Sequence, residues 1–374
     1  MLILKGQCNS AHIMIDEIDE TTRQQIQRML DHPAFANTYI AIMPDCHAGK
    51  GAVIGFTMKM NEYIIPNIVG VDIGCGVLAA RFPVTLDEID LPAFDKYIKK
   101  NIPAGFAIHR TPKVDDDPTL RHWTKVVGMD YDKALRSIGT LGGGNHFIEA
   151  GKDSTGNTWV TIHSGSRHFG LRVATHFQQL ARQTLRRNSS AKQEKDLEYL
   201  LVDSQDGQDY LHAARYAQAY ASLNRQTMLE TIARFLGRDP VETIESVHNF
   251  IGDDDIIRKG ATPARKGERV IIPFNMRDGL ALCTGKGSAK YNYSAPHGAG
   301  RILSRTKAKH MLSVDEFAQS MKKAGVYTTT ANKDTLDEAP DAYKDKELII
   351  QNIRETVEIN DFVIPVYNFK AGKE

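Results

Sequence analysis

The chain has few cysteines and no excess of charge of either sign. Four cysteines occur in 374 residues without the spacing of a disulfide framework, which favours a reducing, cytoplasmic location. Lysine and arginine number 47 against 46 acidic residues, which excludes a histone-like or basic-tail protein but not a local basic groove. No apolar run approaches the roughly 18 residues of a membrane helix, and the N-terminus lacks the apolar core of a secretory signal. A cytoplasmic globular protein remains.

Apolar runs, glycine clusters and helical periodicity alternate along the chain. Short apolar runs separated by glycines over 38–82 predict strands. Further strands are predicted in TWVTIHSGSRHFG, from 158 and running into a glycine turn, at about 269–284, and in the C-terminal VIPVYNFK. Apolar residues recur every three or four positions from about 171 to 237, which predicts a helical insert. Because strand-rich blocks flank this insert, we expect an α+β fold of mixed sheets, with residues 1–374 forming a single domain.

The stretch VGVDIGCGV (69–77) places an acid and a thiol among glycines. Asp72 and Cys75 interrupt an otherwise apolar segment that would suit a buried strand. A buried carboxylate costs several kcal/mol unless it is paired or bound to a metal ion. A small buried cysteine is the alternative for Cys75, but the adjacent glycines and the nearby acid favour metal binding.

Further candidate ligands lie in polar or glycine-rich settings downstream. LGGGNHFIEA contains Asn145, His146 and Glu149, TIHSGSR contains His163, and ESVHNF contains His248. Each histidine alone is more commonly a surface or hydrogen-bonded residue than a ligand. Three imidazoles, one thiolate and one carboxylate together suit Mn²⁺, Zn²⁺ or Fe²⁺, and a thiolate can bridge two such ions.

A histidine before a flexible turn is a candidate nucleophile. In YSAPHGAGRILSR, His297 precedes Gly298 and Gly300, and Arg301 follows four positions later. Backbone N–H groups and the arginine can hold a phosphate there, and imidazole can attack phosphorus. The alternative is a turn histidine beside a surface salt bridge, and the candidate metal ligands favour the nucleophile. PDCHAGKGAVIG (44–55) also has anion-binding character but is not a Walker A loop.

Seven motifs occur in the same order as in one protein family. PDCHAGKGAVIG, VGVDIGCGV, LGGGNHFIE, HSGSR, VHNF, RKGATPA and PHGAGR, from about residue 40 to the C-terminus, resemble the RtcB family of RNA ligases. The resemblance implies a single α+β domain of the family's own type. It also implies an enzyme that joins an RNA 3′-phosphate or 2′,3′-cyclic phosphate end to a 5′-hydroxyl end, using GTP and Mn²⁺, in RNA repair or tRNA splicing.

The resemblance also assigns roles to individual residues. Cys75 would bridge two manganese ions, with Asp72 and His146 completing one site and His163 and His248 the other. His297 would carry GMP covalently. The remaining residues implied in nucleotide or phosphate binding are Asn145, Glu149, Asn275, Gly298, Gly300 and Lys370.

Some positions depart from the family pattern. PFNMRDG (273–279) stands where the family usually has a PGSMG-like turn, so Asn275 replaces a serine contact, and HSGSR is followed by His168 and Phe169 rather than small residues. These departures concern nucleotide preference and RNA specificity, and they leave the metal ligands and the nucleophile intact. They are consistent with a specialised repair paralogue.

Two other functions fit parts of the pattern. A binuclear metallophosphatase or phosphodiesterase acting on nucleic-acid ends would use similar ligands but would need no nucleophilic histidine. A catalytically silent RNA-binding protein would be expected to have lost ligands. The family resemblance further suggests an archease-like activator as a partner, which this sequence does not identify.

Overall fold

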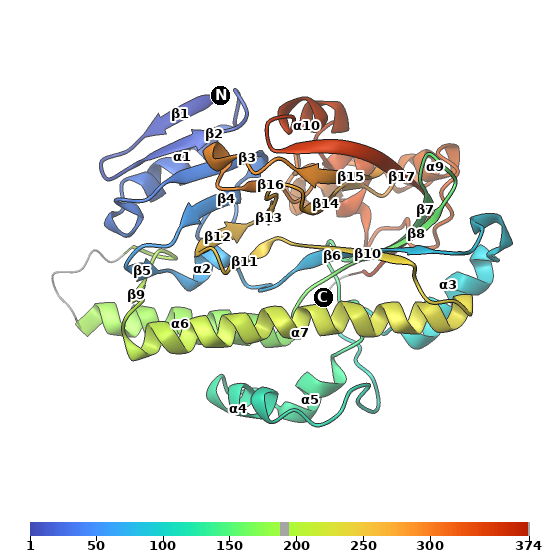
Figure 1. Cartoon of the computed structure of the whole chain (residues 1–374), viewed down its shortest axis with the longest axis horizontal. Helices are drawn as coiled ribbons and strands as arrows, with labels where there is room; N and C mark the ends of the chain where they lie inside the picture. The colour runs from blue at the N-terminus through green and yellow to red at the C-terminus, as the bar shows by residue number, and fades with distance from the viewer. Residues whose placement is uncertain (188–193, 373–374) are drawn as a thin grey trace.

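The computed structural model describes residues 1–187 and 194–372, which form two large β-sheets and a layer of long helices (Figure 1). The six-stranded sheet has the order β1-β2-β3-β4-β12-β11, and only the β2–β3 pair is parallel. Its strands are β1 (Leu2–Lys5), β2 (Ser10–Ile13), β3 (Ile40–His47), β4 (Ile54–Lys59), β12 (Ile256–Lys259) and β11 (Asn249–Ile251).

The seven-stranded sheet is antiparallel throughout, in the order β10-β6-β8-β7-β17-β15-β14. The Ile271 N–H on β14 donates to Ser246 Oγ on β10. The two edge strands are therefore in contact, which shows that the sheet is strongly curled. The strands are β10 (Glu242–Val247), β6 (Gly76–Phe82), β8 (Thr158–Ser164), β7 (Phe147–Lys152), β17 (Val357–Lys370), β15 (Gly279–Gly285) and β14 (Arg269–Asn275). Two small sheets pair β13 (Ala261–Pro263) with β16 (Ser294–Pro296), and β5 (Tyr63–Ile64) with β9 (Leu200–Leu201).

Two long helices, α6 (Arg167–Arg187) and α7 (Gln205–Leu236), run beneath the sheets in Figure 1. Ser204 caps the start of α7, and Gly237 ends it in the left-handed conformation that glycine tolerates. The helices lie in the range predicted as an insert, although α6 begins four residues earlier. The polar stretch 186–196 between them, which the sequence predicts as a solvated loop, lies largely outside the described residues.

The remaining helices are short and lie around the sheets. Helices α4 and α5 lie on the far side of α6 and α7 from the sheets (Figure 1). The helices are α1 (Glu20–Leu30), α2 (Pro66–Val69), α3 (Leu91–Asn101), α4 (Pro118–Val126), α5 (Tyr131–Arg136), α8 (Arg305–Met311), α9 (Val314–Lys323) and α10 (Lys346–Asn352). Within the described ranges, no helix is both long and apolar enough to cross a membrane.

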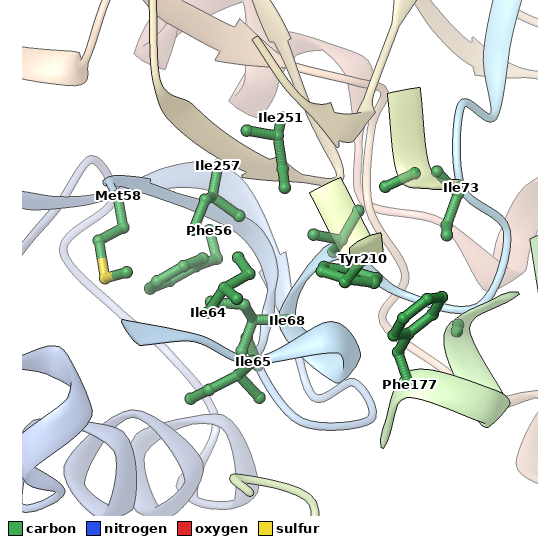
Figure 2. Close-up of a cluster of buried hydrophobic side chains, with 14 of the residues drawn as sticks. Phe56, Met58, Ile64, Ile65, Ile68, Ile73, Phe177, Tyr210, Ile251 and Ile257 are labelled. Carbon is green, nitrogen blue, oxygen red and sulfur yellow. The ribbon is translucent and has the colours of Figure 1, made fainter. Parts of the chain in front are cut away.

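Apolar cores lie between the helices and each sheet. Figure 2 shows Phe56 and Ile257 of the six-stranded sheet above α2, with Phe177 of α6 and Tyr210 of α7 beside them. A second core joins α3 and α7 to one face of the seven-stranded sheet. The predicted α+β class is therefore confirmed. We propose that the chain is one domain, because α7 packs against strands of both large sheets.

The core around α6 gives a stability prediction. Phe177 is 1% exposed, so Phe177→Ala should leave a cavity and lower the free energy of unfolding by about 3–5 kcal/mol. Urea denaturation would measure the change. Leu171→Ala, at an exposed position of the same helix, should change stability much less. Equal losses in the two variants would contradict the assigned core.

Candidate metal centre and nucleotide cavity

A tight turn, rather than a strand, presents the acid and the thiol of VGVDIGCGV. The Cys75 N–H donates to the Asp72 carbonyl at 3.2 Å, and β6 begins only at the next residue. Gly74 has φ +74° in this turn, and a Cβ there would lie 2.7 Å from the Gln218 Cα on α7. Glycine is therefore required both by the backbone conformation and by the close approach of the helix. Strand β6 therefore begins later than the apolar segment 69–77 suggested, because this turn directs both side chains toward one site.

Neighbouring strands bring the three predicted histidines to this turn. Strands β10, β6, β8 and β7 are consecutive in the seven-stranded sheet. His163 lies on β8, with Val77 of β6 and Phe147 of β7 as its paired neighbours. His146 immediately precedes β7, and the His248 N–H, just after β10, donates to the Cys75 carbonyl at 2.9 Å.

The five predicted ligands form two groups that share the thiol. Cys75 Sγ lies 3.3 Å from His163 Nε2 and 3.6 Å from His146 Nε2. His163 Nε2 lies 3.3 Å from His248 Nε2, and His146 Nε2 lies 3.0 Å from Asp72 Oδ2. The groups Cys75–His163–His248 and Asp72–Cys75–His146 each have ligand atoms close enough to surround one ion.

Hydrogen bonds on the far side of two rings fix the nitrogen that faces the site. His146 Nδ1 bonds the Leu141 carbonyl at 2.9 Å, and His163 Nδ1 bonds the Asn145 carbonyl at 3.1 Å. A carbonyl oxygen only accepts, so both Nδ1 atoms donate, and in the neutral rings Nε2 carries the lone pair. Metal-binding histidines are commonly oriented in this way.

Burial sets the charge state of the ligands. Burial, reinforced by neighbouring imidazoles, holds the pKa of His163 and of His248 well below the usual value. Burial and the charge of Asp72 raise the pKa of the Cys75 thiol well above its usual value. The thiol can donate its single S–H to only one of the neighbouring imidazole nitrogens, so with neutral rings the other lone pairs that face the site have no proton donor from the thiol. A bound cation would satisfy these atoms and favour the thiolate, so the residues fit a borderline divalent metal ion.

Asp72 is held as a carboxylate at the start of α6. Burial alone would raise the pKa of Asp72, but a hydrogen bond from His146 in its doubly protonated, metal-free form and the charge of Arg167 outweigh it and lower the pKa to about 2. The Ser166 N–H donates to Asp72 Oδ1 at 3.0 Å. A Cβ at Gly165 would lie 2.1 Å from the same oxygen, so HSGSR needs glycine at this position.

His297 lies beside the metal cluster and is oriented by a buried acid. Its Nδ1 lies 2.6 Å from Asp45 Oδ2, and its ring centroid is 4.8 Å from that of His248. The Asp45 side chain is fully buried, whereas that of His297 is 17% exposed. Because the carboxylate accepts from Nδ1, the lone pair of the neutral ring lies on Nε2. Gly300, with φ +73°, lets the following turn pass the Asp45 backbone, where a Cβ would lie 2.2 Å from the carbonyl oxygen.

One cavity of about 730 Å³ connects these groups. It is large enough for a nucleotide-sized ligand. Among the residues that line it are predicted metal ligands, the candidate nucleophile and all the other predicted nucleotide-binding residues. These predicted residues are Asp72, Cys75, Asn145, Glu149, His163, His248, Asn275, His297, Gly298, Gly300 and Lys370.

Strand pairing places an acid and a lysine at the cavity wall. Glu149 on β7 lies opposite Asn368 on β17, and Asn368 Nδ2 donates to Glu149 Oε2 at 2.8 Å. Burial raises the pKa of Glu149 to about 8, although Asn368 and Lys370 act in the opposite direction. Lys370 Nζ lies 3.2 Å from Glu338 Oε2. Burial lowers the pKa of Lys370, and the charge of Glu338 opposes that change.

Two residues near the nucleophile are engaged within the protein. Asn275 Oδ1 accepts from the N–H groups of Arg277 and Asp278, so its side chain closes the β14–β15 turn. Arg301, considered above as an anion ligand, places its Nη1 3.0 Å from Glu338 Oε1. Both residues line the cavity while making these internal contacts.

Several residues of the site were not identified from the sequence. Asp45 lies in PDCHAGKG, two positions before the histidine of that motif. Its place in this motif was the only feature of the sequence that could have identified it. Glu338 occurs in an ordinary acidic stretch, yet it is buried and contacts Arg301, Arg305 and Lys370. Such contacts join residues far apart in the chain, and local spacing does not reveal them.

Comparisons with known proteins agree with the motif order. The family model described as tRNA-splicing ligase RtcB matches residues 25–127 and 119–371. The RNA-splicing ligase RtcB of Escherichia coli K12 is 32% identical, over 91% of this chain and 92% of that protein. The tRNA-splicing ligase RtcB of Nanoarchaeum equitans is 28% identical over 84% and 83%, and the RNA-splicing ligase RtcB of Mycobacterium tuberculosis is 28% identical over 83% and 91%. This chain belongs to the RtcB family.

Proposed function

We propose that the protein is a GTP- and Mn²⁺-dependent RNA ligase. It would join RNA 3′-phosphate or 2′,3′-cyclic phosphate ends to 5′-hydroxyl ends, in RNA repair or tRNA splicing. The observation that carries the proposal is the His297–Asp45 pair, which opens onto the same cavity as the two ligand groups sharing Cys75. Family membership supports ligation as the overall reaction.

The five ligands would hold two Mn²⁺ ions. Cys75 would contribute to both sites, with Asp72 and His146 on one side and His163 and His248 on the other. When bound, the ions would neutralise phosphate charge and align the reacting oxygens.

His297 would act as the nucleophile toward GTP. Its Nε2 would form a bond to the α-phosphorus as the bond to pyrophosphate breaks, giving a histidine–GMP adduct. Asp45, bonded to Nδ1, would hold the ring in orientation and stabilise the positive charge that develops on it. The fixed tautomer supports this role because it leaves Nε2 unprotonated.

The adduct would then activate the RNA end. An oxygen of the RNA 3′-phosphate would take GMP from His297, forming RNA-ppG. The 5′-hydroxyl would next attack the RNA phosphorus, forming the phosphodiester and releasing GMP, with loss of the hydroxyl proton. A cyclic end would first be hydrolysed to the 3′-phosphate. Activation is needed because a free phosphate has no adequate leaving group.

The cavity wall would select the base. Glu149 would accept hydrogen bonds from the N1–H and 2-amino groups of guanine, with Lys370 nearby. Asn145 would contact a phosphate, and Asn275, Gly298 and Gly300 would contribute to the nucleotide-binding wall. Because the Asn275 side chain closes its own turn, its contribution would come from the shape and backbone of that turn.

The alternatives receive less support. A binuclear phosphatase or phosphodiesterase has no need for a histidine held by a buried carboxylate beside the metal ligands. A silent RNA-binding protein has no need for the converging ligand set. We also propose a cytoplasmic location, in keeping with four free cysteines, and an archease-like protein as a candidate activator.

The shared thiol gives a test of the metal centre. Cys75→Ala should lose both Mn²⁺ ions and abolish adduct formation and ligation, whereas Asp72→Ala should disable the enzyme but retain one ion. Metal content after equilibrium dialysis would measure this. Cys283→Ala, at a buried thiol in a separate apolar core, is the matched control and should bind both ions. Near-normal metal content and activity in Cys75→Ala would contradict the bridging role.

The Glu149 carboxyl predicts pH-dependent nucleotide binding. Burial raises its pKa to about 8, and only the carboxylate can accept from both guanine N–H groups. GTP affinity should therefore rise with pH, by up to about tenfold per unit, until the pH passes that pKa. In Glu149→Gln this rise of GTP affinity with pH should be absent. Any pH dependence that comes from titration of the GTP phosphates should be the same in both proteins. Calorimetric titrations giving parallel pH profiles for the two proteins would contradict the role.

The decisive experiment separates the nucleophile from the metals. With labelled GTP and Mn²⁺, the wild type should form an adduct that peptide mass analysis assigns to His297. His297→Ala should bind Mn²⁺ normally and form none, whereas His212→Ala, at an exposed position of α7, should behave like the wild type. Pre-made RNA-ppG should still be sealed by His297→Ala but not by Cys75→Ala. An adduct in His297→Ala would show that another residue is the nucleophile.

A further inference from the structure

Two adjacent polar residues lie fully buried in the middle of α7, directly behind the metal cluster. Asn224 and Arg225 are both 0% exposed. We infer that they are positioning residues that hold the three ligand-bearing segments in register, so that the metal site is assembled on α7. This inference rests on the metal centre of the proposed function and assigns the pair a role within it.

Asn224 joins two of the segments. Its Oδ1 accepts from the N–H groups of Gly139 and Thr140 at 2.8 and 3.0 Å. Its Nδ2 donates to Ser164 Oγ and to the Gly165 carbonyl, both at 3.1 Å. All four hydrogen-bonding positions of the amide are therefore used.

The contact to Ser164 leads to His146. Ser164 Oγ donates to the Leu141 carbonyl at 2.8 Å, and the same carbonyl accepts from His146 Nδ1 at 2.9 Å. Asn224 is thus connected through one hydroxyl group to the carbonyl that orients a ligand. Ser164 also directly follows His163. Through Ser164, the Asn224 side chain is therefore connected to a candidate ligand in each of the two groups that share Cys75.

Arg225 joins the third segment. Its Nη1 donates to the Gly74 carbonyl at 2.8 Å and to the Ser164 carbonyl at 2.6 Å, and its Nε donates to Glu245 Oε1 at 2.8 Å. Gly74 directly precedes Cys75. A Cβ at Gly76 would lie 3.2 Å from Arg225 Cζ, so the guanidinium lies against the backbone on both sides of the thiol.

Other buried polar residues of α7 behave differently. Thr227 Oγ1 and Thr231 Oγ1 donate to carbonyls of their own helix, at Leu223 and Thr227 respectively. Asn224 and Arg225 instead donate their side-chain hydrogen bonds to loops and strand ends that carry ligands. Residues that orient metal ligands typically change metal affinity by roughly ten- to hundredfold when substituted.

The test measures metal binding directly. Asn224→Asp is isosteric and keeps the acceptor for Gly139 and Thr140 but loses the donor to Ser164 and Gly165. Arg225→Lys keeps the charge but not the paired donors. Each should weaken Mn²⁺ binding by roughly tenfold or more in calorimetric titration. Co²⁺ substituted for Mn²⁺ should give an altered visible and thiolate charge-transfer spectrum.

Controls separate positioning from general stability. Thr231→Val changes a buried polar group of the same helix and should leave Mn²⁺ affinity and the Co²⁺ spectrum unchanged. Ser164→Ala removes the hydroxyl group that connects Asn224 Nδ2 to the Leu141 carbonyl, and it should weaken Mn²⁺ binding even if the Asn224 and Arg225 variants fail to fold. Thermal unfolding of the metal-free proteins identifies any such failure.

The outcomes distinguish this inference from the proposed function. Wild-type affinity and spectrum in folded Asn224→Asp, Arg225→Lys and Ser164→Ala would overturn the positioning role and leave the metal centre intact. Wild-type Mn²⁺ affinity and Co²⁺ spectrum in Arg225→Lys alone would likewise exclude positioning by the paired donors of the Arg225 guanidinium. A wild-type protein that binds no Mn²⁺ would overturn the metal centre and this inference together.

Discussion

The structure depends on the convergence of buried lone pairs on the Cys75 thiol. Imidazole nitrogens lie at 3.3 and 3.6 Å from that sulfur, and a further imidazole nitrogen lies 3.3 Å from one of them. Such an arrangement is unfavourable in a low-dielectric interior unless a cation compensates it. The surrounding fold therefore has to supply rigidity, and the ends of four adjacent strands, a glycine turn and the buried middle of α7 do so.

The same constraint explains the glycine-rich character of the motifs. Gly74, Gly165 and Gly300 are required where a Cβ would enter α7, the Asp72 carboxylate or the Asp45 backbone. The glycines thus serve close approach of polar backbone and side chains rather than flexibility. This packing brings the candidate nucleophile and four of the five candidate metal ligands to one cavity, although they are spread over residues 72–297.

Much of the fold and site could be predicted because local patterns carry the relevant chemistry. A carboxylate, a thiol and histidines in glycine-rich segments are poor core residues, so their presence indicated ligands. The pairing of His297 with Asp45 could not be predicted from spacing, since 252 positions separate them. The burial of Glu338 and the contacts of Asn224 and Arg225 were equally hidden, because they arise only when strand order and helix packing are known. The start of β6 was placed too early for the same reason.

One departure of this chain from the family pattern, the PFNMRDG segment (273–279), lies at the cavity wall. Asn275 uses its side chain to close the β14–β15 turn, and the neighbouring Arg277 places its guanidinium against Asp278. Side-chain contacts from this turn to a nucleotide are therefore replaced by internal hydrogen bonds. On the proposed function, base selection then falls to the wall formed by β7 and β17, where Asn368 fixes Glu149 across the strand pair. A recognition group held between two paired strands is less free to adapt than one on a turn. On the proposed function, guanine selection would thus stay on the rigid sheet, and the turn near the candidate nucleophile could diverge without disturbing the candidate metal ligands.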